Sequence, residues 1–222
     1  REVAILEIFK QDGTEGVIRF AESVPSPSHV GYALGPINDP SIELILLPSF
    51  LTATDSKHRA LVSNFIRSRY NLKGWNWCDE LDKSSWTTEQ LGQFLAFLPF
   101  TEGTWDRVSQ WLQTYETQYW TRADANAYQA DGNLATAIEK LLEHSRPNAA
   151  IAVLAQMLHT TEQLDCDQCI RALLAAPASS EPRYAMNKYH IINLIKFLQR
   201  DQSVNQDHLF QVEWTYIALL DR

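Results

Sequence analysis

Two cysteines with C-x-x-C spacing, Cys166 and Cys169, could support thiol redox chemistry. A cysteine in the first turn of a helix has its thiol pKa lowered by the helix dipole, which favours the reactive thiolate. Redox centres of this kind lie where a strand meets a helix in a βαβ unit, and the sequence predicts no such unit. A thiol-based redox enzyme therefore remains an alternative, and two ordinary helical cysteines are the preferred interpretation.

A zinc site at these cysteines would need two further ligands at matching spacing. Cys78, His159 and His190 are candidates by side-chain type alone, and the six histidines show neither H-x-x-x-H nor H-E-x-x-H spacing. We therefore predict no metal and no cofactor.

Two other patterns are weaker still. Gly13 and Gly16 form no phosphate loop, because no strand precedes them and no Gly-Lys-Ser/Thr follows. The acidic pairs Asp79-Glu80 and Asp165 with Asp167 could act as acid and base, but they are better explained as helix starts. We predict no catalytic residue and do not expect this segment to be an enzyme.

A small basic cluster beside aromatic residues could track single-stranded nucleic acid. Its members are Arg59, Arg67, Arg69, Tyr70, Lys73, Trp75 and Trp77. The formal net charge of the chain is −8, whereas phosphate binding needs a concentrated positive field. A solvated helix face is therefore preferred, and single-stranded nucleic-acid binding remains an alternative function.

An aromatic run is the candidate for binding a protein. The chain has seven tryptophans and eight tyrosines, and these residue types dominate binding hot spots. Five of them could line a groove that grips a peptide or a partner helix: Trp105, Trp111, Tyr115, Tyr119 and Trp120. Packing of these side chains between adjacent helix pairs is the preferred interpretation.

The elements that position these residues are clearest over residues 131–158, where two short amphipathic helices follow each other. Their apolar stripes are Leu134, Ala137, Ile138, Leu141 and Leu142, then Ala150, Val153, Leu154, Met157 and Leu158. The linker is so short that the second helix must fold back antiparallel, with Pro147 at its first position. A lone hairpin cannot bury both stripes, which indicates stacked helix pairs.

Helix signals recur along the rest of the chain, while sustained strand alternation does not appear. Further helices are predicted over residues 2–10, 14–23, 55–71, 187–199 and 205–220, with others starting after Ser26, Asp39, Thr87, Thr101 and Asp165. Thr87 with Gln90 and Asp165 with Gln168 are typical capping boxes.

Three segments are less regular. Residues 42–47 could form a buried strand, although a helix fits the neighbouring segments better. Residues 74–78 are predicted to be an irregular link with aromatic anchors, and residues 176–183 an exposed loop.

These elements predict an all-α fold of about eleven or twelve helices joined by short links. The helix pairs repeat loosely, with a period in the high thirties of residues, so we expect an α-solenoid of stacked antiparallel pairs with degenerate, HEAT-like or TPR-like repeats. No interdomain linker is visible, which favours one helical-repeat domain over residues 1–222. Because the chain starts at Arg1 and stops directly after an apolar helix, we interpret it as a segment of a longer polypeptide.

Composition limits the cellular context. With 222 residues and 45% hydrophobic side chains, the chain can bury a substantial core. Its longest apolar run, residues 42–51, is interrupted by Glu43 and Pro48, so we predict no membrane-spanning segment. Three cysteines form no disulfide framework, which favours a reducing, cytoplasmic location.

Several packing motifs together carry a family resemblance. They are Leu98-Pro99-Phe100, Thr104-Trp105, Tyr119-Trp120, residues 137–150 with Glu139-Lys140-Leu141-Leu142 and Arg146-Pro147, and Val212-Glu213-Trp214-Thr215-Tyr216. Over roughly residues 85–220 the chain resembles a helical region toward the C-terminal part of very large bacterial multidomain proteins. Several of these proteins look like signalling NTPases of the STAND or NACHT type, some implicated in defence against phage.

The resemblance implies fold and context rather than chemistry. We expect a noncatalytic interaction, sensor or scaffold segment whose partner is another protein or a neighbouring domain of the same chain. Residues 1–222 lack the nucleotide-binding and effector domains, so no ATPase activity is carried over to them.

Overall fold

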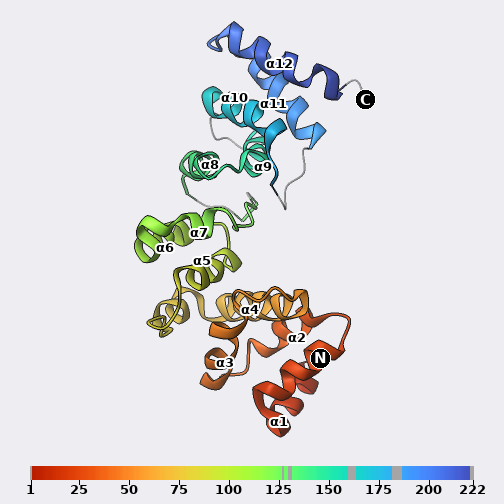
Figure 1. The fold of residues 1–222 in the computed structure, drawn as a ribbon, viewed down its shortest axis with the longest axis vertical. Coiled ribbons are helices and arrows are strands. Elements are labelled where there is room, and N and C mark those ends of the chain that lie inside the picture. Colours follow the sequence, from red (N-terminus) through yellow and green to blue (C-terminus); the bar gives the residue numbers. More distant parts are fainter. Residues whose placement is uncertain (1, 127, 130–131, 160–163, 182–186, 221–222) are drawn as a thin grey trace. The chain divides into compact units, whose positions relative to one another are not determined.

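The computed structural model describes residues 2–126, 128–129, 132–159, 164–181 and 187–220 (Figure 1). These residues form twelve α-helices and two short 3-10 helices, with no strand among them. The prediction of an all-α fold is therefore confirmed, and residues 42–47 are helical. None of the helices in this part of the chain is long and apolar enough to cross a membrane.

Packing divides the chain into two compact units. The first unit contains Arg1–Leu98 and Arg107–Arg122, and the second contains Pro99–Asp106 and Ala123–Arg222. Helix α6 (Glu102–Leu112) contributes residues to both. The single domain expected over residues 1–222 stays a prediction, and each unit is described by itself below.

The first unit is organised around one long helix, α4. Its helices are α1 (Glu2–Ser23), α2 (Pro27–Leu34), α3 (Pro40–Phe50), α4 (Ser56–Glu80), α5 (Thr88–Phe97) and α7 (Thr117–Trp120), with the 3-10 helix η1 (Gln113–Tyr115). Helix α4 packs against α1, α2, α3 and α5, and α5 packs against α7. The core includes Leu34, Ile42, Leu46, Leu61, Phe65 and Phe94, all fully buried.

Glycines interrupt two helices of this unit without ending them. The backbone of α1 leaves helical geometry at Gly13 (φ 65°), where the sequence predicts the junction of two helices. In α4 the same happens at Gly74 (φ 61°). Glycine adopts such a positive φ at no steric cost. Residues 75–80 are helical again, so the irregular link predicted over residues 74–78 is wrong except at Gly74 itself.

Polar caps start the helices where the sequence places them. The Asp39 side chain accepts a hydrogen bond from Ser41 N (2.9 Å), and the Asp55 side chain accepts from Lys57 N and His58 N (both 3.0 Å). Thr87 and Gln90 form a complete capping box before α5. These bonds satisfy backbone donors that have no partner inside the helix.

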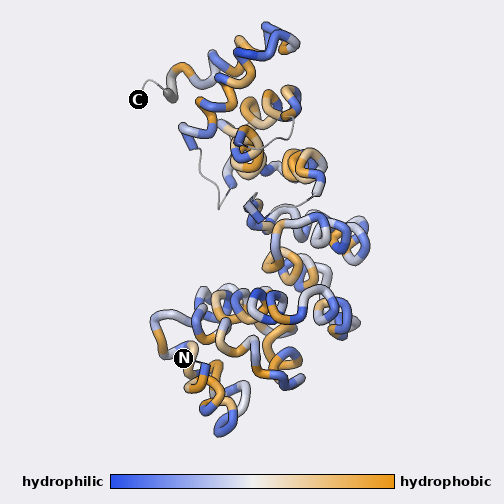
Figure 2. The backbone as a smooth tube through the Cα atoms, turned by 180° about the vertical axis from the view of Figure 1, so that it is seen from behind, coloured by the Kyte–Doolittle hydropathy of each residue, from blue (hydrophilic) through white to orange (hydrophobic). Residues whose placement is uncertain are grey.

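The second unit contains the predicted hairpin and three further helices. They are α8 (Leu134–Glu143), α9 (Pro147–Met157), α10 (Cys166–Ala175), α11 (Lys188–Arg200) and α12 (Gln206–Leu220), with the 3-10 helix η2 (Ala176–Ala178). Helix α9 packs against α8, α10 and α11, while α10 packs against α8, α11 and α12. Hydrophobic residues recur at intervals along these helices (Figure 2), and the predicted stripes of the hairpin are buried except at Leu142 and Leu158, which are half-buried.

A buried ion pair anchors the start of α9. The side chains of Arg146 and Glu181 are 5% and 3% exposed, and Arg146 Nε donates to Glu181 Oε1 at 3.0 Å. Arg146 Nη1 also donates to Ala123 O at 2.7 Å. The exposed loop predicted over residues 176–183 is therefore wrong at Glu181, because its carboxylate is drawn inward by the guanidinium, and at Ala176, which is buried in η2; residues 182 and 183 lie outside the described residues.

Gln168 also departs from its prediction. Asp165 caps α10 by accepting from Asp167 N and Gln168 N. The Gln168 side chain instead donates to Ala135 O (2.9 Å) and Glu139 Oε2 (3.3 Å) on α8. It thus joins α10 to α8, and the reciprocal half of the predicted capping box is absent.

Candidate protein-binding face

The C-x-x-C thiols are held in their neutral form. Burial raises the pKa of Cys169 to about 12 and that of Cys166 to about 11, and Cys166 Sγ also donates to Asp201 Oδ2 at 3.4 Å. The expectation that the helix dipole lowers the thiol pKa is wrong in direction, because desolvation and the nearby carboxylates outweigh it. In the part of the chain that the structure describes, no three His, Cys, Asp or Glu side chains cluster as metal ligands.

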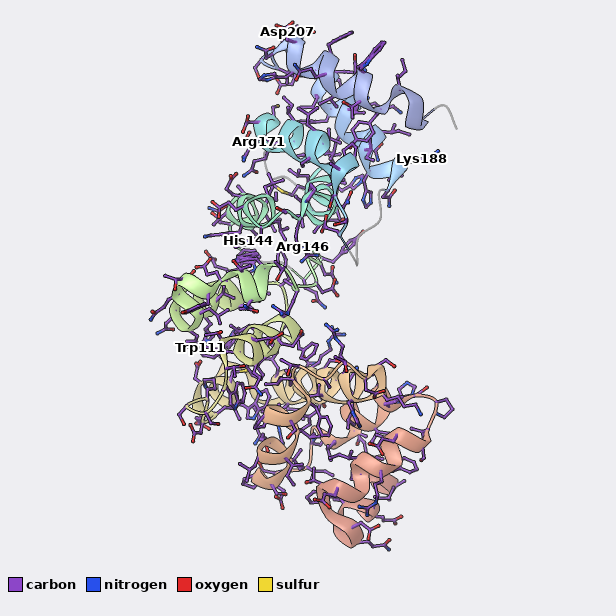
Figure 3. The ribbon with its side chains drawn as sticks, in the orientation of Figure 1. Trp111, His144, Arg146, Arg171, Lys188 and Asp207 are labelled. Atoms are coloured by element: carbon purple, nitrogen blue, oxygen red, sulfur yellow. The ribbon has the colours of Figure 1, made fainter. Side chains whose placement is uncertain are left out.

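The aromatic run is mostly internal. Trp105, Tyr119 and Trp120 are buried, whereas Trp111 is half-buried and Tyr115 is 57% exposed. The Trp111 ring, labelled in Figure 3, receives Lys83 Nζ at 4.7 Å from its centroid. Trp105 lies in the second unit and the other four in the first. Three of the five candidate side chains are thus packed rather than presented to a partner.

The basic cluster is largely engaged within the first unit. Arg69 is 1% exposed, and its Nη2 donates to Ile37 O (2.8 Å) and pairs with Glu43 Oε1 (2.9 Å). Lys73 Nζ donates to Asn38 Oδ1 at 2.7 Å, and Trp77 is buried. The buried and paired Arg69 is therefore not available to a nucleic-acid phosphate, whereas Arg67 is exposed.

Helix α12 presents a row of large apolar side chains to solvent. Phe210, Trp214 and Ile217 are 61%, 66% and 55% exposed, and their spacing of four and then three residues places them on one helix face. The Phe210 and Trp214 rings are stacked, with centroids 6.0 Å apart and an interplanar angle of 25°. We call these three residues the α12 row.

A second row holds α12 in place. Leu209, Val212 and Tyr216 are buried, and Tyr216 OH donates to Leu173 O on α10 at 2.7 Å. Burial raises the pKa of Tyr216 above its ordinary value, so this hydroxyl remains a donor. At 3.6 residues per turn, the α12 row lies roughly 130° around the helix from this buried row. Figure 3 shows side chains of α12 that project away from α10 and α11.

The charges beside the α12 row are negative. On the helix, Asp207 lies on one side of the row and Glu213 lies on the other. Glu213 is positioned by Gln199, whose Nε2 donates to Glu213 Oε1 at 2.7 Å. Helix α12 contains no lysine or arginine. A partner with lysines or arginines beside an apolar stripe therefore matches this face.

Sequence reasoning missed this face. The sequence analysis predicts a helix over residues 205–220 and groups Trp214 with Val212 and Tyr216 in one packing motif, although these residues lie on two rows that point in different directions. The available signal was the spacing of Phe210, Trp214 and Ile217 beside that of Leu209, Val212 and Tyr216. Two apolar rows on one helix indicate two contact surfaces.

Comparison of the chain with protein-family models, with curated proteins and with solved structures found no match.

Proposed function

We propose that this chain is a noncatalytic protein-interaction segment that binds an amphipathic helix on the α12 row. The observation that supports this function is the row itself: three large apolar side chains, each more than half exposed, in register on one helix. Exposed apolar patches of this kind mark interaction sites, and tryptophan is among the residues that contribute most to binding energy.

The packing of the second unit supports a helical partner. Helix α10 packs on α8, α12 packs on α10, and α11 packs on α9, so each helix contacts the next but one along the chain. This series is the arrangement expected of a short α-solenoid with HEAT-like or TPR-like pairs. A partner helix on the α12 row would extend the series by one position. Its apolar stripe would contact the row as α12 itself contacts α10.

Charge selects among amphipathic helices. Asp207 and Glu213 flank the row, so lysines or arginines beside the partner's stripe would gain favourable contacts, whereas glutamates there would be repelled. A nucleic acid is a poor match because its phosphates would meet the same two carboxylates.

A designed helical peptide tests the proposal. The probe has leucines at positions 1, 4, 5 and 8 of its stripe and lysines on both sides, and its matched controls carry glutamates beside the stripe or serines within it. Binding is followed by NMR through the tryptophan indole resonances, with Trp214 assigned by Trp214→Phe. We expect the lysine peptide to shift the Trp214 indole saturably and to bind more tightly than both controls.

A charge reversal distinguishes specific docking on the α12 row from nonspecific hydrophobic binding. In Asp207→Lys/Glu213→Lys the preference should invert, so that the glutamate peptide binds more tightly than the lysine peptide. Reversal of Glu15 and Glu102, exposed carboxylates outside α12, is the matched control and should leave the preference unchanged. Equal binding of lysine and glutamate peptides to the parent chain would remove the charge argument. Shifts confined to other indoles would remove the proposed face.

The wider context is a proposal as well. The resemblance to helical regions of STAND or NACHT type signalling proteins and the cytoplasmic location stay predictions. In such a protein, a neighbouring domain of the same chain would supply the helix. The same peptide experiment tests the α12 row for either source.

A further inference from the structure

The first unit contains a groove of about 470 Å³, whereas the α12 row belongs to the second unit. Residues 38–48, before and within α3, form one wall, and the end of α4 with residues 81–86 forms the other. Its apolar surface comes from Leu44, Leu47, Pro48, Trp77, Leu81 and Trp86. The volume is in the range of pockets that bind small ligands or peptide side chains. We call it the α3–α4 groove.

The groove has an excess of negative charge. Asp39, Glu43, Glu80 and Asp82 line it, whereas Lys73 is the one cationic side chain among its described lining residues. Hydrogen bonds from Ser41 lower the pKa of Asp39, and those from Ser84 lower the pKa of Asp82. Both carboxylates therefore stay ionised well below neutral pH, and the groove favours a cation.

One carboxylate oxygen in the groove lacks a donor. Glu43 Oε1 pairs with Arg69 Nη2 at 2.9 Å and accepts from Trp77 Nε1 at 3.1 Å. Glu43 Oε2 is buried, and no hydrogen-bond donor among the described residues reaches it. Oε2 itself has almost no exposed surface, so Glu43 adds to the groove through its charge rather than as a direct hydrogen-bond acceptor.

The apolar walls define the rest of the ligand. Leu44 is 76% exposed at the groove, and Trp86 stands beside it with its ring held edge-on against Phe94, 5.3 Å between centroids. An indole face attracts a guanidinium, which is planar, weakly hydrated and rich in N–H donors. Leucine and proline side chains suit aliphatic neighbours of that cation.

We propose that the α3–α4 groove binds a peptide segment in which an arginine is flanked by aliphatic residues. The guanidinium enters the acidic groove beside Trp86, and the aliphatic neighbours contact Leu44 and Pro48. This site is additional to the α12 row: it belongs to the other unit and takes a peptide side chain rather than a helix face.

Three short peptides test the site by NMR titration of the whole chain. The probe is acetyl-Leu-Arg-Leu-amide, and the controls replace arginine by glutamine or by glutamate. We expect the arginine peptide to shift amide resonances of residues 38–48 and 73–86 saturably. The glutamine peptide should bind about threefold more weakly, which lies within the roughly 1.4-fold to 5-fold that one exposed ion pair contributes, and the glutamate peptide more weakly still.

Variants at exposed lining residues locate the site without disturbing the core. Glu80→Gln/Asp82→Asn should lower the affinity for the arginine peptide by about threefold to tenfold and leave the affinity for the glutamine peptide nearly unchanged. Leu44→Lys removes part of the apolar wall and adds a cation, so it should lower the affinity for the arginine peptide by at least about tenfold. Leu72→Lys is the matched control: Leu72 is 60% exposed on α4, does not line the groove, and its substitution should have no effect.

Each other outcome overturns the proposal. Equal binding of the three peptides would show that charge does not select the ligand. No saturable shift with any peptide would show that the groove is not a peptide site. An equal loss of affinity for the arginine peptide in Leu44→Lys and Leu72→Lys would show that added positive charge on the unit, rather than the groove, accounts for the change.

Discussion

Replacing Glu181 by glutamine should destabilise the second unit more than any change of an exposed charge. The Glu181 carboxylate accepts hydrogen bonds from Arg146 Nε (3.0 Å), Asn148 N (2.5 Å) and Ala149 N (3.3 Å). It therefore compensates a buried guanidinium and caps the N-terminus of α9 at once. The amide of glutamine keeps one oxygen, and its NH2 group must face donors on one side or the other.

The size of the loss follows from burial. Removing one partner of a buried ion pair costs about 3–5 kcal/mol, because the other charge is left uncompensated. Arg146, which is labelled in Figure 3, retains its hydrogen bond to Ala123 O. We therefore expect a loss at the lower end of this range, about 3 kcal/mol. That is a large fraction of the roughly 5–15 kcal/mol that stabilises a domain.

Amide hydrogen exchange measures this effect where it arises. A loss of about 3 kcal/mol should speed exchange of the most protected α9 amides by about 100-fold. Glu143→Gln is the control, since Glu143 is 52% exposed and 3.5 Å from Lys140, and it should cost at most about 0.5 kcal/mol. Arg146→Met/Glu181→Met should recover part of the loss, as no charge stays buried. A loss below about 1 kcal/mol in Glu181→Gln would refute the reasoning.

Three further predictions concern packing, thiol reactivity and capping. Gly31→Ala should destabilise the first unit by about 1–3 kcal/mol in urea unfolding, because a Cβ there would lie 2.0 Å from Leu61 O; an unchanged midpoint would contradict the close approach of α2 and α4. Cys166 should react with iodoacetamide at mildly alkaline pH about 10-fold to 100-fold more slowly than a thiol with the ordinary pKa of 9.0, and Cys169 more slowly still. Raising the pKa of Cys166 to about 11 lowers its thiolate fraction about 100-fold, while the more basic thiolate is somewhat more nucleophilic; rates of a free thiol would contradict the shifts. Thr87→Ala should cost about 1 kcal/mol of the free energy of unfolding, and Thr87→Ser much less, if the capping box matters as its geometry indicates.

The ends of helices were predictable because local chemistry determines them. Asp39 and Thr87 cap the helices that follow them, and Gly13 interrupts α1, as the sequence predicts. The irregular link predicted over residues 74–78 was wrong because Gly74 alone absorbs the change of chain direction. After it, Trp77 and Cys78 pack into the core, and this tertiary burial restores the helix.

Contacts between distant residues were not predictable from local patterns. The composition of residues 176–183 indicates an exposed loop, yet Glu181 is drawn inward by a charge 35 residues away. Nothing in the spacing of either residue signals that pairing. For the aromatic run, the sequence favours packing and leaves a hot spot open, and the burial of Tyr119 and Trp120 agrees with packing.

The α12 row could be located in the sequence by its spacing, but its exposure could not be predicted. Its spacing was present in the sequence, but exposure depends on which row of α12 the neighbouring helices α10 and α11 cover. Burial of Val212 and Tyr216 leaves Phe210 and Trp214 outside. The row therefore became visible as a surface only once the partners of α12 were known.

The affinity of the lysine-flanked helical peptide for Trp214→Ala tests the central claim most directly. Trp214 is 66% exposed, so docking can bury about 150 Å² of its surface, worth up to about 4 kcal/mol at about 25 cal/mol per Å². We predict a loss of about 2–4 kcal/mol, at least about 30-fold in Kd, and an unchanged Kd for Tyr189→Ala, an aromatic residue 63% exposed on α11. Equal affinity of Trp214→Ala and Tyr189→Ala for the peptide would contradict the claim that the α12 row is a protein-binding face.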